Sequence, residues 1–189
     1  MRSSGSMAGD LAAHCLNAKP MDQRKTSMAP AGAERPLLLV LGSLPGEASL
    51  KAQRYYAHPQ NQFWRLLGTA LGEPLAELEY NQRLVRLAER HVGLWDVVGE
   101  ARRIGSLDGS LREVTANALA DYVAEQPQLR AIAFNGQTAG RIGRSALGAS
   151  ALTLIDLPSS SPAYTLAFAD KATRWSELAN FAQPATLSR

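Results

Sequence analysis

The chain contains 189 residues, of which 46% are hydrophobic and 20% are charged, and its formal net charge is +3. This composition is typical of one globular domain and excludes a disordered or fibrous chain. The longest apolar run, residues 37–41, is far shorter than the roughly 20 residues that cross a bilayer. One cysteine and three separated histidines give no metal-binding spacing, so we expect no metal site. Because the net charge is small, any nucleic-acid contact must be a local feature.

Residues 1–34 are predicted to be a disordered tail. They are rich in Ser, Gly, Ala and Met, show no sustained hydrophobic period, and lack the apolar stretch of a secretory signal. The pattern changes at Arg35, and residues 35–189 are expected to form a single domain.

Four short apolar runs predict strands that are buried on both faces, at residues 37–41, 92–98, 131–134 and 152–157. Apolar residues at helical spacing predict helices at 63–71, around 84–88, from 110 to 126, around 142–147 and from about 170 onward. The third of these helices is expected to open with the capping-box sequence at 110–113. Strands that alternate with helices predict an α/β fold around a four-stranded, mainly parallel sheet.

Each predicted strand is followed by residues that a core does not require. These are the Gly/Pro-rich segment 42–64, then Asp96, then Asn135 with Gly136, and finally the segment 157–165. In open α/β sheets, ligands bind outside the carboxyl ends of the strands. The four segments are therefore expected to converge on one site.

The segment 42–64 carries several candidate binding residues, each with an ordinary structural alternative. Gly42, Pro45 and Gly46 predict a tight turn where backbone can approach a ligand. Of the two adjacent tyrosines, one can stack on a nucleobase while Tyr55 is equally suited to the core. Asn61 is suited to capping a helix, and His58 to capping or to lining the site.

The segment 158–162, with the sequence PSSSP, is rigid at both ends and rich in hydroxyl groups. Serine hydroxyls and exposed backbone N–H groups suit phosphate oxygens. A plain surface loop is the alternative, but its place between a buried strand and a helix favours a functional role.

Together these segments resemble the uracil-DNA glycosylase superfamily over residues 36–182. The GSLPG at 42–46 is similar to its first motif, YYAHPQNQFW at 55–64 to a stretch of its mismatch-specific branch, and LPSSSP at 157–162 to its second motif. With GLWD at 93–96 and FNG at 134–136, the chain most resembles the DNA-deoxyinosine (hypoxanthine-DNA) glycosylase family. The resemblance implies a three-layer αβα fold.

The resemblance also implies site residues and a reaction that needs no metal or cofactor. Uracil-removing members carry Asn or Asp where this chain has Leu44, which argues against efficient uracil removal and moves the catalytic role to Asn61, with Glu47 and His58 in reserve. The base-binding residues implied are Gly42, Ser43, Leu44, Pro45, Tyr56, Asp96 and Asn135. The DNA-binding residues implied are Ser159, Ser160, Ser161, Pro162, Tyr164, Arg141 and Arg144.

The function expected is hydrolytic removal of hypoxanthine from DNA by a monomeric enzyme that leaves an abasic site. An intracellular, cytoplasmic protein without a membrane partner is expected. Uracil, xanthine or a mismatched base remain alternative substrates on the same scaffold. A non-catalytic nucleic-acid binding module is the alternative from another class, and a flavodoxin-like cofactor carrier is a third.

Overall fold

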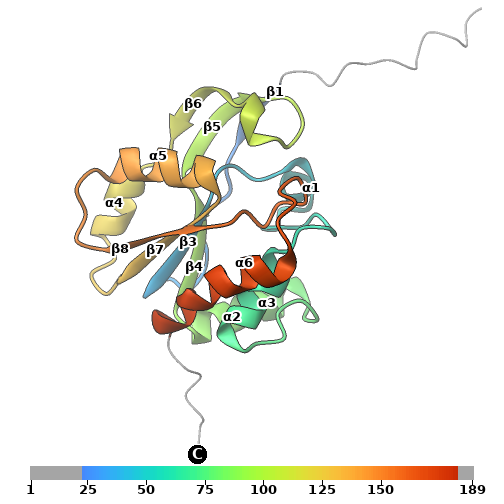
Figure 1. Cartoon of the computed structure of the whole chain (residues 1–189). Coiled ribbons are helices and arrows are strands. Elements are labelled where there is room, and N and C mark those ends of the chain that lie inside the picture. The colour runs from blue at the N-terminus through green and yellow to red at the C-terminus, as the bar shows by residue number, and fades with distance from the viewer. Residues whose placement is uncertain (1–22, 183–189) are drawn as a thin grey trace, which may run out of the picture.

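The computed structural model describes residues 23–182 (Figure 1). Its main sheet has the strand order β2-β4-β3-β7-β8. The strands are β2 (Ala31–Gly32), β4 (Val92–Asp96), β3 (Leu38–Gly42), β7 (Ala131–Asn135) and β8 (Thr153–Leu157). β4, β3, β7 and β8 pair in parallel, which confirms the predicted four-stranded sheet, and the short β2 adds an antiparallel edge.

Helices cover both faces of this sheet, as the three-layer prediction required (Figure 1). Within β3, Leu38 and Val40 pack into one core cluster whereas Leu39 and Leu41 pack into the other, because successive strand residues point to opposite faces. The first face is covered by α2 (Phe63–Leu71), α3 (Tyr80–Glu89), α6 (Phe168–Trp175) and the 3-10 turn η2 (Ser176–Asn180). The second is covered by α4 (Leu119–Ala124) and α5 (Gln137–Leu147). The short α1 (Glu47–Ala52) follows β3.

A second, antiparallel sheet has the order β1-β5-β6, from β1 (Gln23–Thr26), β5 (Val98–Arg103) and β6 (Arg112–Ala116). The segment 92–98, predicted as one strand, therefore belongs to two. β4 ends at Asp96 in the main sheet, and β5 begins at Val98 in the second sheet. The tail prediction is wrong for residues 23–34, because β1 pairs with β5 and β2 pairs with β4. These strands are too short to show a hydrophobic period. The rest of the predicted tail, residues 1–22, lies outside the described residues.

The helix predicted from residue 110 is also wrong in its first half. The Ser110 hydroxyl donates to the carbonyls of Ile104 and Leu107 in place of capping a helix. Residues 108–110 form the 3-10 turn η1, and β6 then pairs with β5 although all its side chains are exposed. Backbone hydrogen bonding to β5 therefore makes residues 112–116 a strand, and α4 is the part of the predicted helix that is found. Within residues 23–182 no helix is both long and apolar enough to span a membrane.

Candidate functional site

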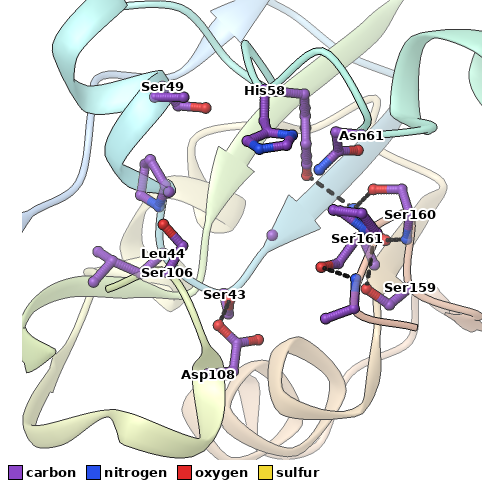
Figure 2. Close-up of a pocket in the computed structure, with 18 of the residues that line it drawn as sticks. Ser43, Leu44, Ser49, His58, Asn61, Ser106, Asp108, Ser159, Ser160 and Ser161 are labelled. Atoms are coloured by element: carbon purple, nitrogen blue, oxygen red, sulfur yellow. Dashed lines mark hydrogen bonds between the residues drawn. The ribbon is translucent and has the colours of Figure 1, made fainter. Parts of the chain in front are cut away.

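A pocket of about 430 Å³ lies at the carboxyl ends of the parallel strands. Its walls are the turn after β3, the segment 55–61, Asp96, Asn135, the loop 159–164, and residues 106–108 of the β5–β6 hairpin. Figure 2 shows the loop with Ser159, Ser160 and Ser161 facing Ser43 and Asp108 across this space. The predicted convergence of the four strand ends is thus seen in the fold, and the hairpin is an unpredicted fifth wall.

The turn after β3 brings Gly42, Ser43, Leu44 and Pro45 to the pocket wall. A Cβ at Gly42 would lie 2.7 Å from Asp96 Oδ1 and 3.0 Å from the Tyr56 hydroxyl, so only glycine fits here. The Leu44 side chain is buried and joins the core cluster on the second face of the sheet. The turn therefore presents backbone groups to a ligand and no polar side chain at Leu44.

Tyr56 is held rigidly at the pocket, with a positive φ of 53°. Its ring stacks on Phe63 at a centroid distance of 3.6 Å and an interplanar angle of 7°. Because Phe63 covers one face of the ring, a ligand can stack only on the other. Burial raises the pKa of the Tyr56 phenol, which keeps it neutral. The adjacent Tyr55 is 3% exposed and belongs to the core.

Asp96 is a buried carboxyl group in the pocket wall, 3% exposed. Ser27 Oγ donates to its Oδ2 at 2.9 Å. Burial raises the pKa of Asp96 to about 7, against opposing hydrogen bonds from Ser27 and Tyr55. Near neutral pH this group can therefore either accept or donate a hydrogen bond.

Asn61 and His58 both line the pocket beside each other (Figure 2). Asn61 Oδ1 accepts the Phe63 N–H at 3.0 Å, which fixes the amide at the start of α2. His58 is exposed, and its Nδ1 accepts the Gln60 N–H at 3.2 Å. Asn61 thus lines the pocket and also accepts a backbone N–H at the start of α2, although the N-cap residue of that helix is Gln62.

The serine loop, residues 158–162, is held by hydrogen bonds along the loop and by others to neighbouring elements. Ser159 Oγ accepts the Ser161 N–H, and Ser161 Oγ accepts the Ala163 N–H. Ser160 is fully buried, and its hydroxyl accepts a hydrogen bond from Asn135 at 2.9 Å. This burial argues against the predicted phosphate contact for Ser160, because the hydroxyl does not reach solvent.

The exposed Pro162 and Tyr164 continue this wall at the pocket rim. Behind the rim lies Lys171 of α6, which is 1% exposed. Its Nζ donates to the Tyr164 carbonyl at 2.7 Å and to Gln62 Oε1 at 2.9 Å. Lys171 thereby joins the pocket rim at Tyr164 to the segment that carries Asn61.

Three predicted residues do not line the pocket. The Glu47 carboxylate accepts a hydrogen bond from Lys25 at 2.7 Å, which lowers the pKa of Glu47 and argues against its reserve role as water activator. Arg144 on α5 forms an ion pair with Asp156 at 2.9 Å, so its positive charge already has a partner within the protein. Arg141 lies exposed on the same helix.

Several pocket residues were missed from the sequence. Ser106, Leu107 and Asp108 line the pocket from the β5–β6 hairpin. Ser27 and the buried Lys25 do not line the pocket, but they bind Asp96 and Glu47 from the segment assigned to the tail. Because these groups follow no buried strand of the main sheet, hydrophobic pattern gave no signal for them. No group of three His, Cys, Asp or Glu side chains suited to a metal ion occurs within residues 23–182.

Comparisons with known proteins agree with this geometry. A family model described as the Uracil DNA glycosylase superfamily matches residues 29–182. A protein of Methanosarcina acetivorans named "Hypoxanthine DNA glycosylase" is 38% identical over 138 residues, which is 73% of this chain and 87% of that protein. A relative with the same name from Methanosarcina barkeri is 38% identical over 117 residues, 62% of this chain and 74% of the relative.

A solved structure is also similar. It is a solution NMR structure from Methanosarcina acetivorans, described as that of a uracil DNA glycosylase. The TM-score is 0.69 at 34% sequence identity, and the match covers 82% of this chain and 96% of the other.

Proposed function

This chain belongs to the uracil DNA glycosylase superfamily, and we propose that it is a DNA repair glycosylase whose principal substrate is hypoxanthine. The enzyme flips the damaged nucleotide into the pocket and hydrolyses its N-glycosidic bond, which leaves an abasic site. The observation that carries the proposal is that one pocket unites Tyr56, Asn61, Asn135 and the serine loop. Two relatives of this chain bear the name of a hypoxanthine DNA glycosylase.

The pocket offers a stacking surface and polar groups for the base. Tyr56 stacks on the base with the ring face that Phe63 leaves open. Hypoxanthine has an N1–H donor and an O6 acceptor, whereas adenine has an N1 acceptor and an amino donor. The buried Asp96 distinguishes the two bases from the pocket wall. Its ionised carboxylate accepts a hydrogen bond from N1–H of hypoxanthine, but adenine N1 carries no hydrogen to donate.

Asn135 supplies an amide to the base edge from the end of β7. In the free protein its Nδ2 also donates to the Tyr56 hydroxyl at 3.3 Å. A base that accepts from this amide exchanges with that contact, so the pocket loses little hydrogen bonding on binding.

Asn61 positions the attacking water, because an amide is too weak a base to remove a proton. The bond from the sugar to a good leaving group breaks through an oxocarbenium-like state, so a positioned water is sufficient. Backbone N–H groups around Ser43 stabilise negative charge on the departing base. Leu44 holds no water, and this disfavours uracil as the main substrate.

The exposed rim of the pocket contacts the DNA strand. Ser159, Ser161, Pro162 and Tyr164 lie along this rim, where hydroxyl and backbone groups meet the flanking phosphates. Arg141 remains a phosphate contact farther along the duplex. Because one chain forms the whole pocket, we infer that the enzyme acts as a monomer, and its DNA substrate implies that it acts inside the cell.

The test is single-turnover incubation with duplexes that each carry one hypoxanthine, uracil or xanthine, followed by alkaline strand scission. We expect the fastest cleavage at hypoxanthine and slow cleavage at uracil. Faster cleavage at uracil or xanthine would show that hypoxanthine is not the principal substrate, while the assignment as a DNA glycosylase would stand. Salt-dependent binding with no cleavage of any duplex would favour the non-catalytic module.

A further inference from the structure

The hairpin wall of the pocket contains a carboxyl group beside the turn that lacks one. Asp108, in the 3-10 turn between β5 and β6, lines the pocket next to Ser43 (Figure 2). Ser43 Oγ donates to Asp108 Oδ1 at 2.6 Å. The next residue in the turn, Leu44, is the position that has no polar side chain. Asp108 thus brings a negative group to the turn from a distant part of the sequence.

A buried arginine lies beside this carboxyl group and binds the turn. Arg103, which is 0% exposed, donates from Nη1 to the Leu44 carbonyl at 3.0 Å and from Nη2 to the Pro45 carbonyl. Its Nη1 also lies 3.9 Å from Asp108 Oδ1. One guanidinium therefore binds the turn and faces the carboxyl group.

Two further contacts hold the hairpin loop to the turn. Lys25 Nζ donates to the Gly105 carbonyl at 2.7 Å, and the Glu47 N–H donates to Ser106 Oγ at 3.0 Å. The loop is thus attached at Gly105 and Ser106, which lie just before Asp108 in the chain. A charge that is positioned before the substrate arrives stabilises a transition state without the cost of rearrangement.

We propose that Asp108 is a further catalytic residue, whose carboxylate faces the sugar of the flipped nucleotide and stabilises the positive charge that develops as the base departs. The inference rests on the proposed glycosylase function. Asn61 still positions the water, which forms the new bond to the anomeric carbon. The base leaves with the electron pair of the N-glycosidic bond, and the water's proton passes to solvent. Asp108 carries charge only.

The groups around Asp108 determine the pH range in which its carboxyl group is ionised. Burial raises its pKa, and the hydrogen bond from Ser43 and the charge of Arg103 oppose that rise. Asp96, Tyr56 and His58 line the same pocket, and the ion pair of Lys25 with Glu47 lies behind the hairpin loop. We therefore expect the cleavage rate to rise with pH as Asp108 ionises.

The test compares Asp108→Asn with Asp121→Asn, which changes an exposed acid on α4 away from the pocket. Single-turnover cleavage of a hypoxanthine duplex is measured from pH 4.5 to 8.5. Asp108→Asn should lower the rate by about 100-fold to 1,000-fold and flatten the rise that belongs to Asp108, whereas Asp121→Asn should match the wild type. An Asp96→Asn variant shows which group causes the increase of cleavage rate with pH. Because its Asp96 no longer titrates, the increase that remains should come from Asp108.

Two further measurements separate a catalytic from a structural role. Asp108→Ala should regain activity on addition of formate, which supplies a carboxylate to the vacated space, whereas a misfolded variant should not. Affinity for a duplex with an abasic-site analogue should be unchanged. A rate within threefold of the wild type for Asp108→Asn, or no recovery with formate, overturns the role of Asp108. A wild-type protein that cleaves no damaged duplex overturns the proposed function itself.

Discussion

Asn135 and Ser160 bind each other reciprocally across the floor of the pocket. Asn135 Nδ2 donates to Ser160 Oγ at 2.9 Å, and the Ser160 N–H donates to Asn135 Oδ1 at 2.9 Å. The Ser160 carbonyl in turn accepts the Gln62 N–H at 3.0 Å. This pair therefore joins the end of β7 to the serine loop and to the start of α2, and it sets the spacing of three walls of the pocket.

We expect Ser160→Ala to act on stability and cleavage and not on phosphate binding. Loss of the buried acceptor should cost about 1 kcal/mol in the free energy of unfolding and should slow cleavage as the Asn135 amide loses its fixed position. The affinity for an undamaged duplex should be unchanged, because the buried hydroxyl contacts no phosphate. Ser161→Ala, on the rim, is the matched variant and should weaken duplex binding. A loss of duplex affinity in Ser160→Ala but not in Ser161→Ala would restore the phosphate role of Ser160.

A second prediction separates the two roles of Asn61. Asn61→Ser keeps an oxygen that can accept the Phe63 N–H but removes the amide from the pocket, whereas Asn61→Ala removes both. Both variants should lose single-turnover activity, and only Asn61→Ala should also lose about 1 kcal/mol of stability. The measurements are cleavage of a hypoxanthine duplex and denaturant unfolding. Full activity in folded Asn61→Ala would show that another group positions the water.

The sequence sufficed for the parallel sheet and for the convergence of its strand ends. Runs such as 37–41 are buried on both faces, so composition alone marks them, and topology then places Gly42, Asp96 and Asn135 together. Strand pairing of exposed residues leaves no such mark. β6 is exposed along its whole length, and its backbone partners lie in β5.

The polar network around the turn was beyond sequence reasoning for a related reason. Arg103 is fully buried although its residue type favours the surface, because backbone carbonyls of Leu44 and Pro45 satisfy its guanidinium. Such partners come from residues about 60 positions away in the chain, and no local pattern encodes them. The contacts of Lys25 and Asp108 belong to the same network.

Gly42→Ala should damage the pocket by steric contact. The added Cβ would lie 2.7 Å from Asp96 Oδ1, closer than real Cβ atoms come, so the buried carboxyl group or the strand must shift. We expect lower thermal stability and a loss of cleavage. Gly109→Ala is the control, because a Cβ there meets nothing within 4 Å. Equal melting temperatures and rates for the two variants would contradict the packing argument.

The raised pKa of Asp96 predicts that stability decreases as the pH rises. Its folded pKa is about 7, above the ordinary aspartate pKa of 3.8, so between these values the folded state binds more protons than the unfolded state. The contribution of Asp96 is therefore fully present below about pH 4 and is lost as the pH rises to about 7.

Asp96→Asn should remove that dependence, since an amide does not titrate. The difference in unfolding free energy between the variant and the wild type should move in favour of the variant from pH 5 to pH 8. Urea unfolding at both pH values measures it. Ser27→Ala should raise the pKa of Asp96 further, because it removes a hydrogen bond that lowers this pKa. The loss of stability with rising pH should then be larger than in the wild type. A difference that stays constant with pH would mean that Asp96 is ionised throughout and reads the base only as an acceptor.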